Sequence, residues 1–392
     1  MKKTAGAASL LSAKALWPVP VLLGASFVIS WAAEAAQFFI SQGLSLAILA
    51  WIQALPEFAV EATIAWRAGL DPLHDTTLMI ANLTGSLRIL VGLAWPMIYT
   101  VAEIFHYRRH GKFLAAIRLK EEHAIEVVCL LPCLLYFFYI WAKDSLNLYD
   151  TFVLLAIYAG YLYILHRMPP EKLEETEDMP EPVRRVLALP GKRRALAIIG
   201  LFVVGGCLLF FAAGPFLHTM EAAAVSLGIS QFFLVQWISP LLSEFPEKLA
   251  AFNWARRIHT APMALMNMVS SNINQWTLLP ALLPPLLCYS AGDFITVTFN
   301  PIQEREILLT LAQSLLGLLM IWKLSFYWGE ALLLFALWLA QFCVPSWREE
   351  MLWVYLVAIA VELSWLALRP GPRAHRAFLR EWQRTGKPAA AA

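Results

Sequence analysis

The chain has 392 residues, of which 59% are hydrophobic and only 15% are charged, and it contains 16 Trp, 23 Phe and 11 Tyr. Soluble globular domains are about 45–50% apolar and about 25% charged, so this composition excludes an ordinary soluble protein. The formal net charge of +2 also excludes the basic surplus that nucleic-acid-binding proteins carry. We therefore expect the lipid bilayer, and no nucleic acid, to be a partner of this chain.

Apolar runs of roughly 20 residues, the length that crosses a bilayer as a helix, recur along the chain. In the first half they fall at 16–33, 38–66, 76–100, 124–142 and 147–166. In the second half they fall at 195–215, 219–252, 260–290, 306–324 and 328–346, and a further run at 350–368 precedes a basic tail. The Pro-rich, mixed-charge segment 168–194 predicts a solvated cytoplasmic linker that buries no core. These patterns predict an all-α polytopic membrane protein with about eleven spans.

Lys and Arg are distributed unevenly between the predicted loops on the two sides of the membrane. If the N-terminus lies outside, most of them fall in the loop 108–120, the linker 168–194 and the tail 369–387. Basic loops favour the cytoplasmic side, which predicts an outside N-terminus and a cytoplasmic C-terminus in a bacterial inner (plasma) membrane. The 5 Cys lie in apolar runs, and neither Cys nor His shows the spacing of a metal site. We expect no enzyme and no covalent cofactor.

The two halves of the chain share a set of motifs in the same order. In the first half these are Glu34-Ala35-Ala36, Ile40-Ser41-Gln42, Leu55-Pro56-Glu57, and Asn82 with Gly85-Ser86. In the second they are Glu221-Ala222-Ala223, Ile229-Ser230-Gln231, Phe245-Pro246-Glu247, and Asn267 with Ser270-Ser271. An odd number of spans per half turns the second copy upside down. This predicts two inverted five-helix repeats, at 1–167 and 195–346, followed by an extra helix and tail at 347–392.

Each Pro-Glu pair lies inside an apolar run. A proline breaks or kinks a helix, and a broken helix at membrane depth is tolerated only beside protein or a water-filled cavity. Glu57 and Glu247 would face that opening, and carboxylates within a membrane usually mark ion pathways. With the amides of Asn82 and Asn267 they predict an all-oxygen shell suited to hard cations. The alternative is that each Pro-Glu pair marks a helix end at the membrane surface.

With these motifs the sequence resembles the cation/calcium exchanger superfamily, whose repeats carry G-T-S-L-P-E and then G-N-x-x-G-S-N. The matching segments are 52–57 with 81–86 in the first repeat, and 242–247 with 266–272 in the second. The resemblance implies that Glu57 and Glu247 are the central metal ligands. It also implies that Asn82, Asn267 and Ser243 are flanking cation ligands, with Glu244 beside them.

The sequence departs from the family pattern at positions where it loses a hydroxyl group or gains a charge. Gln53 and Ala54 stand where the family has Thr-Ser, and Glu244 stands in place of Ser. Arg88 and Lys248 add fixed positive charges near the expected site. They are possible internal counter-charges, with Lys248 pairing Glu244 and Arg88 pairing Glu57 or Glu61. The alternative is that both basic side chains snorkel to the membrane surface.

The resemblance implies a secondary active antiporter that exchanges Ca²⁺ or another cation for Na⁺ or H⁺ by alternating access at a carboxylate site near the membrane midplane. The alternative is a non-transporting membrane sensor or scaffold on the same fold, with the cavity filled by Arg88 and Lys248. Glu34 and Glu221 are expected to open the repeat helices, where negative charge favours a helix N-terminus. Asn272, Asn274 and Gln275 have no amide counterparts in the first repeat, so we expect an asymmetric site.

Overall fold

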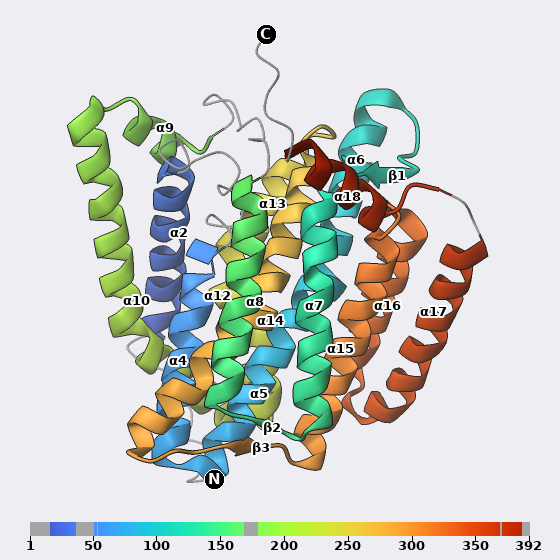
Figure 1. The fold of residues 1–392 in the computed structure, drawn as a ribbon. Helices are drawn as coiled ribbons and strands as arrows, with labels where there is room; N and C mark the ends of the chain where they lie inside the picture. Colours follow the sequence, from blue (N-terminus) through green and yellow to red (C-terminus); the bar gives the residue numbers. More distant parts are fainter. Residues whose placement is uncertain (1–15, 37–50, 53, 168–178, 369–370, 386–392) are drawn as a thin grey trace. The chain divides into compact units, whose positions relative to one another are not determined.

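The computed structural model describes residues 16–36, 51–52, 54–167, 179–368 and 371–385. It is built almost entirely of helices, which form two compact units (Figure 1). Unit 1 comprises Met1–Ser86, Pro170–Glu247 and Leu282–Ile295, and unit 2 comprises Leu87–Pro169, Lys248–Ala281 and Thr296–Ala392. Each unit therefore draws on both halves of the chain. The division into repeats at 168–194 stays a prediction.

Unit 1 contains both Pro-Glu pairs, the first on α4 and the second at the start of α13. Its elements are α2 (Pro18–Ala36), α4 (Leu55–Leu70), most of α5 (Pro72–Ile89), α9 (Glu181–Leu187), α10 (Gly191–Leu227), α11 (Gln231–Phe233), the π-helix η5 (Leu234–Ile238), α12 (Ser239–Ser243), the start of α13 (Phe245–Ala255) and the end of α14 (Ala261–Ala291). Helices α2 and α10 pack along each other, and Gly205 of α10 lies directly against Ile29 of α2.

Unit 2 contains the rest of α5, α13 and α14 and the C-terminal helices. Its further elements are η3 (Leu90–Ala94), α6 (Trp95–His110), β1 (Ala116–Arg118), α7 (Ala124–Ala142), β2 (Ser145–Leu146), α8 (Leu148–Arg167), β3 (Val297–Thr298), α15 (Pro301–Ile321), β4 (Ser325–Tyr327), α16 (Trp328–Cys343), η6 (Pro345–Trp347), α17 (Arg348–Leu368) and α18 (Ala374–Thr385). Two short antiparallel pairs join its loops, with Ala116 opposite Tyr327 and Ser145 opposite Thr298.

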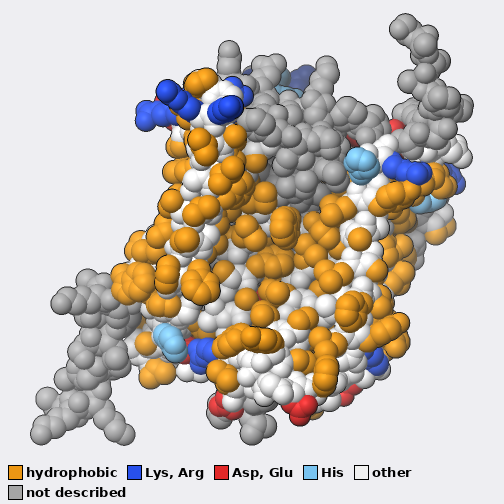
Figure 2. Space-filling model, turned by 60° about the vertical axis from the view of Figure 1, so that its left-hand side comes forward, with side chains coloured by type: hydrophobic (Ala, Val, Ile, Leu, Met, Phe, Trp, Pro, Cys, Tyr) orange, Lys and Arg blue, Asp and Glu red, His pale blue; other side chains and the backbone are white. Residues whose placement is uncertain are grey.

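Six helices among the described residues are long and apolar enough to cross a membrane. They are Pro18–Ala36, Thr76–His110, Ala124–Ala142, Leu148–Arg167, Gly191–Leu227 and Pro345–Leu368. Along α10 the surface is almost wholly hydrophobic, and Lys and Arg gather at its N-terminal end (Figure 2). This distribution matches a helix whose side faces lipid. The total of about eleven spans stays a prediction.

Helix α10 corrects one predicted boundary. One span was predicted to end at 215 and the next to begin at 219, but α10 runs without a break from Gly191 to Leu227 and contains Pro215. It ends at Gly228, which adopts a left-handed φ of 66° that glycine tolerates best. Glu221 therefore lies inside a helix, and Glu34 lies near the C-terminus of α2. The expectation that these residues open the repeat helices is wrong.

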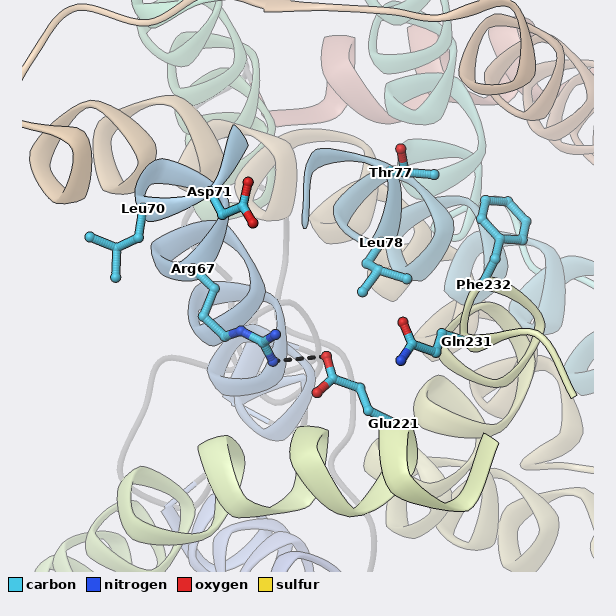
Figure 3. Close-up of a pocket in the computed structure, with 8 residues that line it drawn as sticks. All are labelled: Arg67, Leu70, Asp71, Thr77, Leu78, Glu221, Gln231 and Phe232. Atoms are coloured by element: carbon cyan, nitrogen blue, oxygen red, sulfur yellow. Dashed lines mark hydrogen bonds and ion pairs between the residues drawn. The ribbon is translucent and has the colours of Figure 1, made fainter. Parts of the chain in front are cut away.

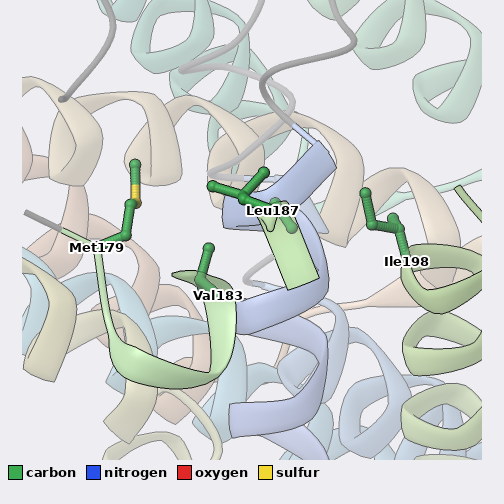
Figure 4. Close-up of a cluster of buried hydrophobic side chains, with 5 residues drawn as sticks. Met179, Val183, Leu187 and Ile198 are labelled. Carbon is green, nitrogen blue, oxygen red and sulfur yellow. The ribbon is translucent and has the colours of Figure 1, made fainter. Parts of the chain in front are cut away.

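The linker is also not wholly solvated, contrary to expectation. Met179, Val183 and Leu187 are buried and form a hydrophobic cluster with Ala35 of α2 and Ile198 of α10 (Figure 4). Val183 and Leu187 are four residues apart and lie on one face of α9, and Met179 precedes the helix. The average polarity of the linker concealed this apolar face. Residues 168–178 lie outside the described part of the chain.

The exposed face of α9 is polar. Glu181 accepts hydrogen bonds from Arg185 at 3.0 Å and from Arg184 at 2.6 Å. The hydrogen bond from Arg185 and the charge of Arg184 lower the pKa of Glu181. The segment therefore keeps a charged outer face while its apolar face docks on the transmembrane helices.

Replacing Leu187 with Ala tests this docking. The substitution removes buried apolar atoms, and we expect a loss of about 2–3 kcal/mol in the free energy of unfolding. Thermal unfolding in detergent should show a lower melting temperature for Leu187→Ala. The matched control is Leu196→Ala, at an exposed position of α10, which should leave the melting temperature unchanged. Equal effects of the two variants would contradict the docking of α9.

Candidate functional site

The two Pro-Glu pairs lie at helix starts inside the protein. Helix α4 begins at Leu55 with Pro56 in its first turn, so Glu57 lies next to the helix N-terminus. In the second half, α12 ends at Ser243, Glu244 follows it, and α13 begins at Phe245. The predicted break beside Glu247 is therefore present. Glu57 and Glu247 are each only 1% exposed, which excludes the alternative of carboxylates in water at the membrane surface.

Side chains of α5 contact the carboxylates of both halves within unit 1. The Asn82 amide Nδ2 donates a hydrogen bond to Glu61 Oε2, and the Ser86 hydroxyl donates one to Glu244 Oε1. Asn82 and Ser86 are one turn apart on α5, so one helix face bridges α4 and the α12–α13 junction. Helix α12 also contacts α4. The structure thus brings Asn82, Glu61 and Glu244 into one buried polar cluster.

Several oxygen atoms of this cluster lack a donor. Glu61 Oε1, Asn82 Oδ1 and Ser239 Oγ are buried and have no hydrogen-bond partner among the described residues. The Ser243 hydroxyl donates to the carbonyl of Ser239 at 3.1 Å, so its lone pairs remain for another ligand. A buried acceptor without a donor costs about 1–3 kcal/mol, which a cation or water would offset. The donor set is all oxygen and fits a hard cation.

The carboxylates do not form a closed metal cage. Within the described residues no group of three or more His, Cys, Asp or Glu side chains is arranged to hold a metal ion. The ligands of a bound cation would therefore include amide and hydroxyl oxygens beside the carboxylates. Such a mixed shell binds a cation less tightly than a carboxylate cage.

Asn267 and Lys248 belong to unit 2 and are both buried. The face of α14 that follows Asn267 is polar. Ser270 Oγ lies 2.9 Å from the hydroxyl of Tyr161, and Asn274 is fully buried. The corresponding stretch of α5 is apolar at Leu87, so the expected asymmetry between the two halves is present in the burial pattern.

Arg88 is bound by several side chains of unit 2. Its guanidinium donates to Thr310 Oγ1 at 2.8 Å, to Gln341 Oε1 at 3.2 Å and to the carbonyl of Glu306 at 2.8 Å. It also forms an ion pair with the Glu306 carboxylate. Arg88 is 1% exposed, so it does not snorkel to the surface.

The carboxylate partner of Arg88 within unit 2 was not predicted. Arg88 forms an ion pair with Glu306 in unit 2, and Glu61 accepts a hydrogen bond from Asn82 in unit 1, so the pairing of Arg88 with Glu57 or Glu61 stays a prediction. Sequence reasoning missed Glu306 because it lies at the start of a predicted span and belongs to none of the motifs that the two halves share. The available signal was Arg88 itself, because a buried guanidinium within a membrane requires a carboxylate.

Gly85 sets the distance between α5 and the π-helix η5. A Cβ added at Gly85 would meet the carbonyl oxygen of Gln236 and lie 2.6 Å from its carbonyl carbon. This close approach places Asn82 and Ser86, on the same helix, beside the α12–α13 junction. A residue without a Cβ is therefore required at position 85, as is common where two membrane helices pack closely.

Gly85→Ala is expected to push α5 away from η5. Overpacking costs about 1–3 kcal/mol, which should lower the melting temperature in detergent. Gly206→Ala is the matched control, because a Cβ at Gly206 meets nothing within 4 Å. An unchanged melting temperature in Gly85→Ala would refute this packing constraint.

Comparisons with known proteins agree with this geometry. The model of the family described as sodium/calcium exchanger protein matches residues 16–166 and again residues 197–347. A comparison with curated protein sequences finds no match. The crystal structure of the H⁺/Ca²⁺ exchanger CAX is 28% identical, with a TM-score of 0.84, and the match covers 94% of this chain and 89% of CAX.

Two further solved structures share the fold. The sodium-calcium exchanger NCX_Mj is 18% identical with a TM-score of 0.54, over 84% of this chain and 96% of that one. Native YfkE is 15% identical with a TM-score of 0.58, over 82% and 88% respectively. The apolar helices and these matches identify an integral membrane protein. Because the family model covers most of the sequence in two successive matches, the chain belongs to the sodium/calcium exchanger protein family, within the cation/calcium exchanger superfamily.

Proposed function

We propose that this protein is a secondary antiporter that exchanges Ca²⁺ for H⁺ by alternating access. The observation that carries the proposal is the set of buried carboxylates in unit 1 of an exchanger fold: Glu57, Glu61, Glu244 and Glu247. Family membership supports cation antiport as the class of activity. Glu57 and Glu247 are the proposed central ligands, with the oxygens of Asn82 and Ser243 in the same unit beside them. The assignment of Asn267 as a ligand rests on the sequence motif alone.

Competition between the two ions follows from the burial of these carboxylates. A carboxylate in a medium of low dielectric constant is costly unless a cation or a proton neutralises it. A Ca²⁺ ion can neutralise two carboxylates, and two protons can do the same after it leaves. Because both ions use the same oxygens, the site holds one or the other, and this coupling is what exchange requires.

Two observations favour H⁺ over Na⁺ as the coupling ion. The chain is more similar to CAX, an H⁺/Ca²⁺ exchanger, than to the sodium-calcium exchanger NCX_Mj. In addition, Gln53 and Ala54 replace the Thr-Ser of the family pattern, which removes hydroxyl oxygens that could bind a monovalent cation. Gln53 lies outside the described residues.

The transport cycle uses the inverted repeats. The two family matches, at 16–166 and 197–347, support a five-helix repeat that occurs twice, with α17 as the extra helix. We infer that one helix bundle rocks against the other around the carboxylates and opens the site to each side in turn. The sorting of basic residues supports an outside N-terminus and a cytoplasmic C-terminus.

Purified protein in proteoliposomes tests this function. Ca²⁺ uptake is measured with an outward H⁺ gradient, with an outward Na⁺ gradient and with no gradient, in otherwise identical vesicles. We expect the H⁺ gradient to drive uptake well above the level without a gradient. Uptake driven only by Na⁺ would assign Na⁺ as the coupling ion, and no flux of any tested cation would refute antiport.

The alternative of a non-transporting sensor or scaffold required Arg88 and Lys248 to fill the cavity. Its support is weaker because the Arg88 guanidinium is engaged by Glu306, Thr310 and Gln341 within unit 2.

A further inference from the structure

Unit 1 contains a cavity of about 590 Å³ at the end of α4. Its polar lining comes from Arg67 of α4, Asp71 just after α4, Thr77 of α5, Glu221 of α10 and Gln231 of α11 (Figure 3). In Figure 3 the side chains of Arg67 and Glu221 point toward each other across the space between α4 and α10. The cavity is thus a polar hollow with charged groups of both signs.

The cavity lies next to the buried carboxylate cluster on the same two helices. Leu78, which also lines the cavity, precedes Asn82 by one helical turn, or about 6 Å along α5. Arg67 follows Glu61 by six residues, or about 9 Å along α4. Since Asn82 donates to Glu61, the cavity ends within two turns of that pair. A cation that enters the cavity is therefore close to the buried oxygens.

An ion pair spans the cavity. Arg67 Nη1 lies 2.9 Å from Glu221 Oε1, and the two side chains are 28% and 15% exposed, respectively. His218, one turn earlier on α10, lies with Nδ1 3.5 Å from the other Glu221 oxygen. The pair joins α4, which carries Glu57 and Glu61, to the C-terminal part of α10. Partial burial makes it stronger than an exposed pair.

We propose that this cavity is the access vestibule for the transported cation and that Arg67–Glu221 is its charged latch. The inference rests on the proposed antiport. Glu221 attracts a divalent cation, and Arg67 repels it and holds α10 against α4. An arriving Ca²⁺ competes with Arg67 for the Glu221 carboxylate, so occupation of the vestibule releases the latch. The latch thus sets the apparent affinity for cation on this side of the membrane.

Single charge removals should act in opposite directions. We expect Arg67→Gln to lower the KM for Ca²⁺ about fivefold and Glu221→Gln to raise it about fivefold, with smaller changes in maximal rate, as expected for one charge a few ångströms from the ion path. The matched control is the exposed pair Arg305–Glu349 in unit 2, at 2.6 Å, where Arg305→Gln and Glu349→Gln should leave KM unchanged. KM shifts of the same sign in Arg67→Gln and Glu221→Gln, or no shift, would overturn the proposal.

A second measurement tests the latch without transport. In a Thr77→Cys background, labelling by a membrane-impermeant thiol reagent reports access to the vestibule, and mass spectrometry of the peptide excludes signal from other cysteines. We expect Arg67→Gln to increase the labelling rate, and Ca²⁺ to increase it in the parent but not in Glu221→Gln. Equal labelling rates in all variants would overturn the latch. If the wild type carried no Ca²⁺ flux, the proposed function would fail while this assay still reported on the latch.

Discussion

Glu57→Gln and Glu247→Gln are each expected to lower H⁺-driven Ca²⁺ uptake by at least about hundredfold. Glutamine keeps the shape and one oxygen of glutamate but removes its charge, so the site can neither neutralise Ca²⁺ nor exchange it for a proton. A loss of about 2.7 kcal/mol of stabilisation along the transport path corresponds to this factor. Radioactive Ca²⁺ uptake into proteoliposomes, at equal protein content, measures it.

Glu350→Gln is the control for this result. Glu350 is exposed near the start of α17, and the substitution makes the same chemical change away from the buried cluster. We expect its uptake to match the wild type. Melting temperatures close to that of the wild type would show that the two buried variants remain folded. If Glu247→Gln kept more than half of the uptake, Glu247 would not be a ligand.

The membrane helices could be predicted well from the sequence where one apolar run forms one straight helix. The predicted span 124–142 coincides with α7, Ala124–Ala142, and 147–166 differs from α8 by one residue at each end. Backbone groups in hydrocarbon must bond within their own segment, so apolar length alone predicts a helix there. The burial of Glu57 and Glu247 could be predicted for a related reason, because each follows a proline inside an apolar run.

Features that depend on tertiary packing could not be predicted. A predicted span ended at residue 215, yet α10 continues to Leu227, because the residues from Met220 to Ala224 favour helix. The apolar face of α9 is short and lies within a charged segment, so composition concealed it. Arg88 and Glu306 are 218 residues apart, and only the fold brings them together.

The Arg88–Glu306 pair gives the second large expected effect. Arg88→Met should lower the free energy of unfolding by about 3–5 kcal/mol, because it leaves a fully buried carboxylate without its main counter-charge. Glu306 would keep its ion pair with Arg348, whose side chain is 28% exposed. The melting temperature in detergent should fall clearly below that of the wild type. Arg348→Gln is the matched control and should cost less, since Arg88 still neutralises Glu306.

A double variant that removes both charges tests whether the Arg88–Glu306 pair acts in stability or in transport. Replacing a buried ion pair with apolar residues of similar volume is often neutral, so Arg88→Met with Glu306→Met should recover most of the lost melting temperature. If Arg88 serves only to hold α5 in place, the double variant should also recover Ca²⁺ uptake, because Asn82 and Ser86 return to their carboxylates. Recovered stability without recovered uptake would place the Arg88 charge in the transport cycle itself. A stable, active Arg88→Met single variant would contradict the buried ion pair as an anchor of α5.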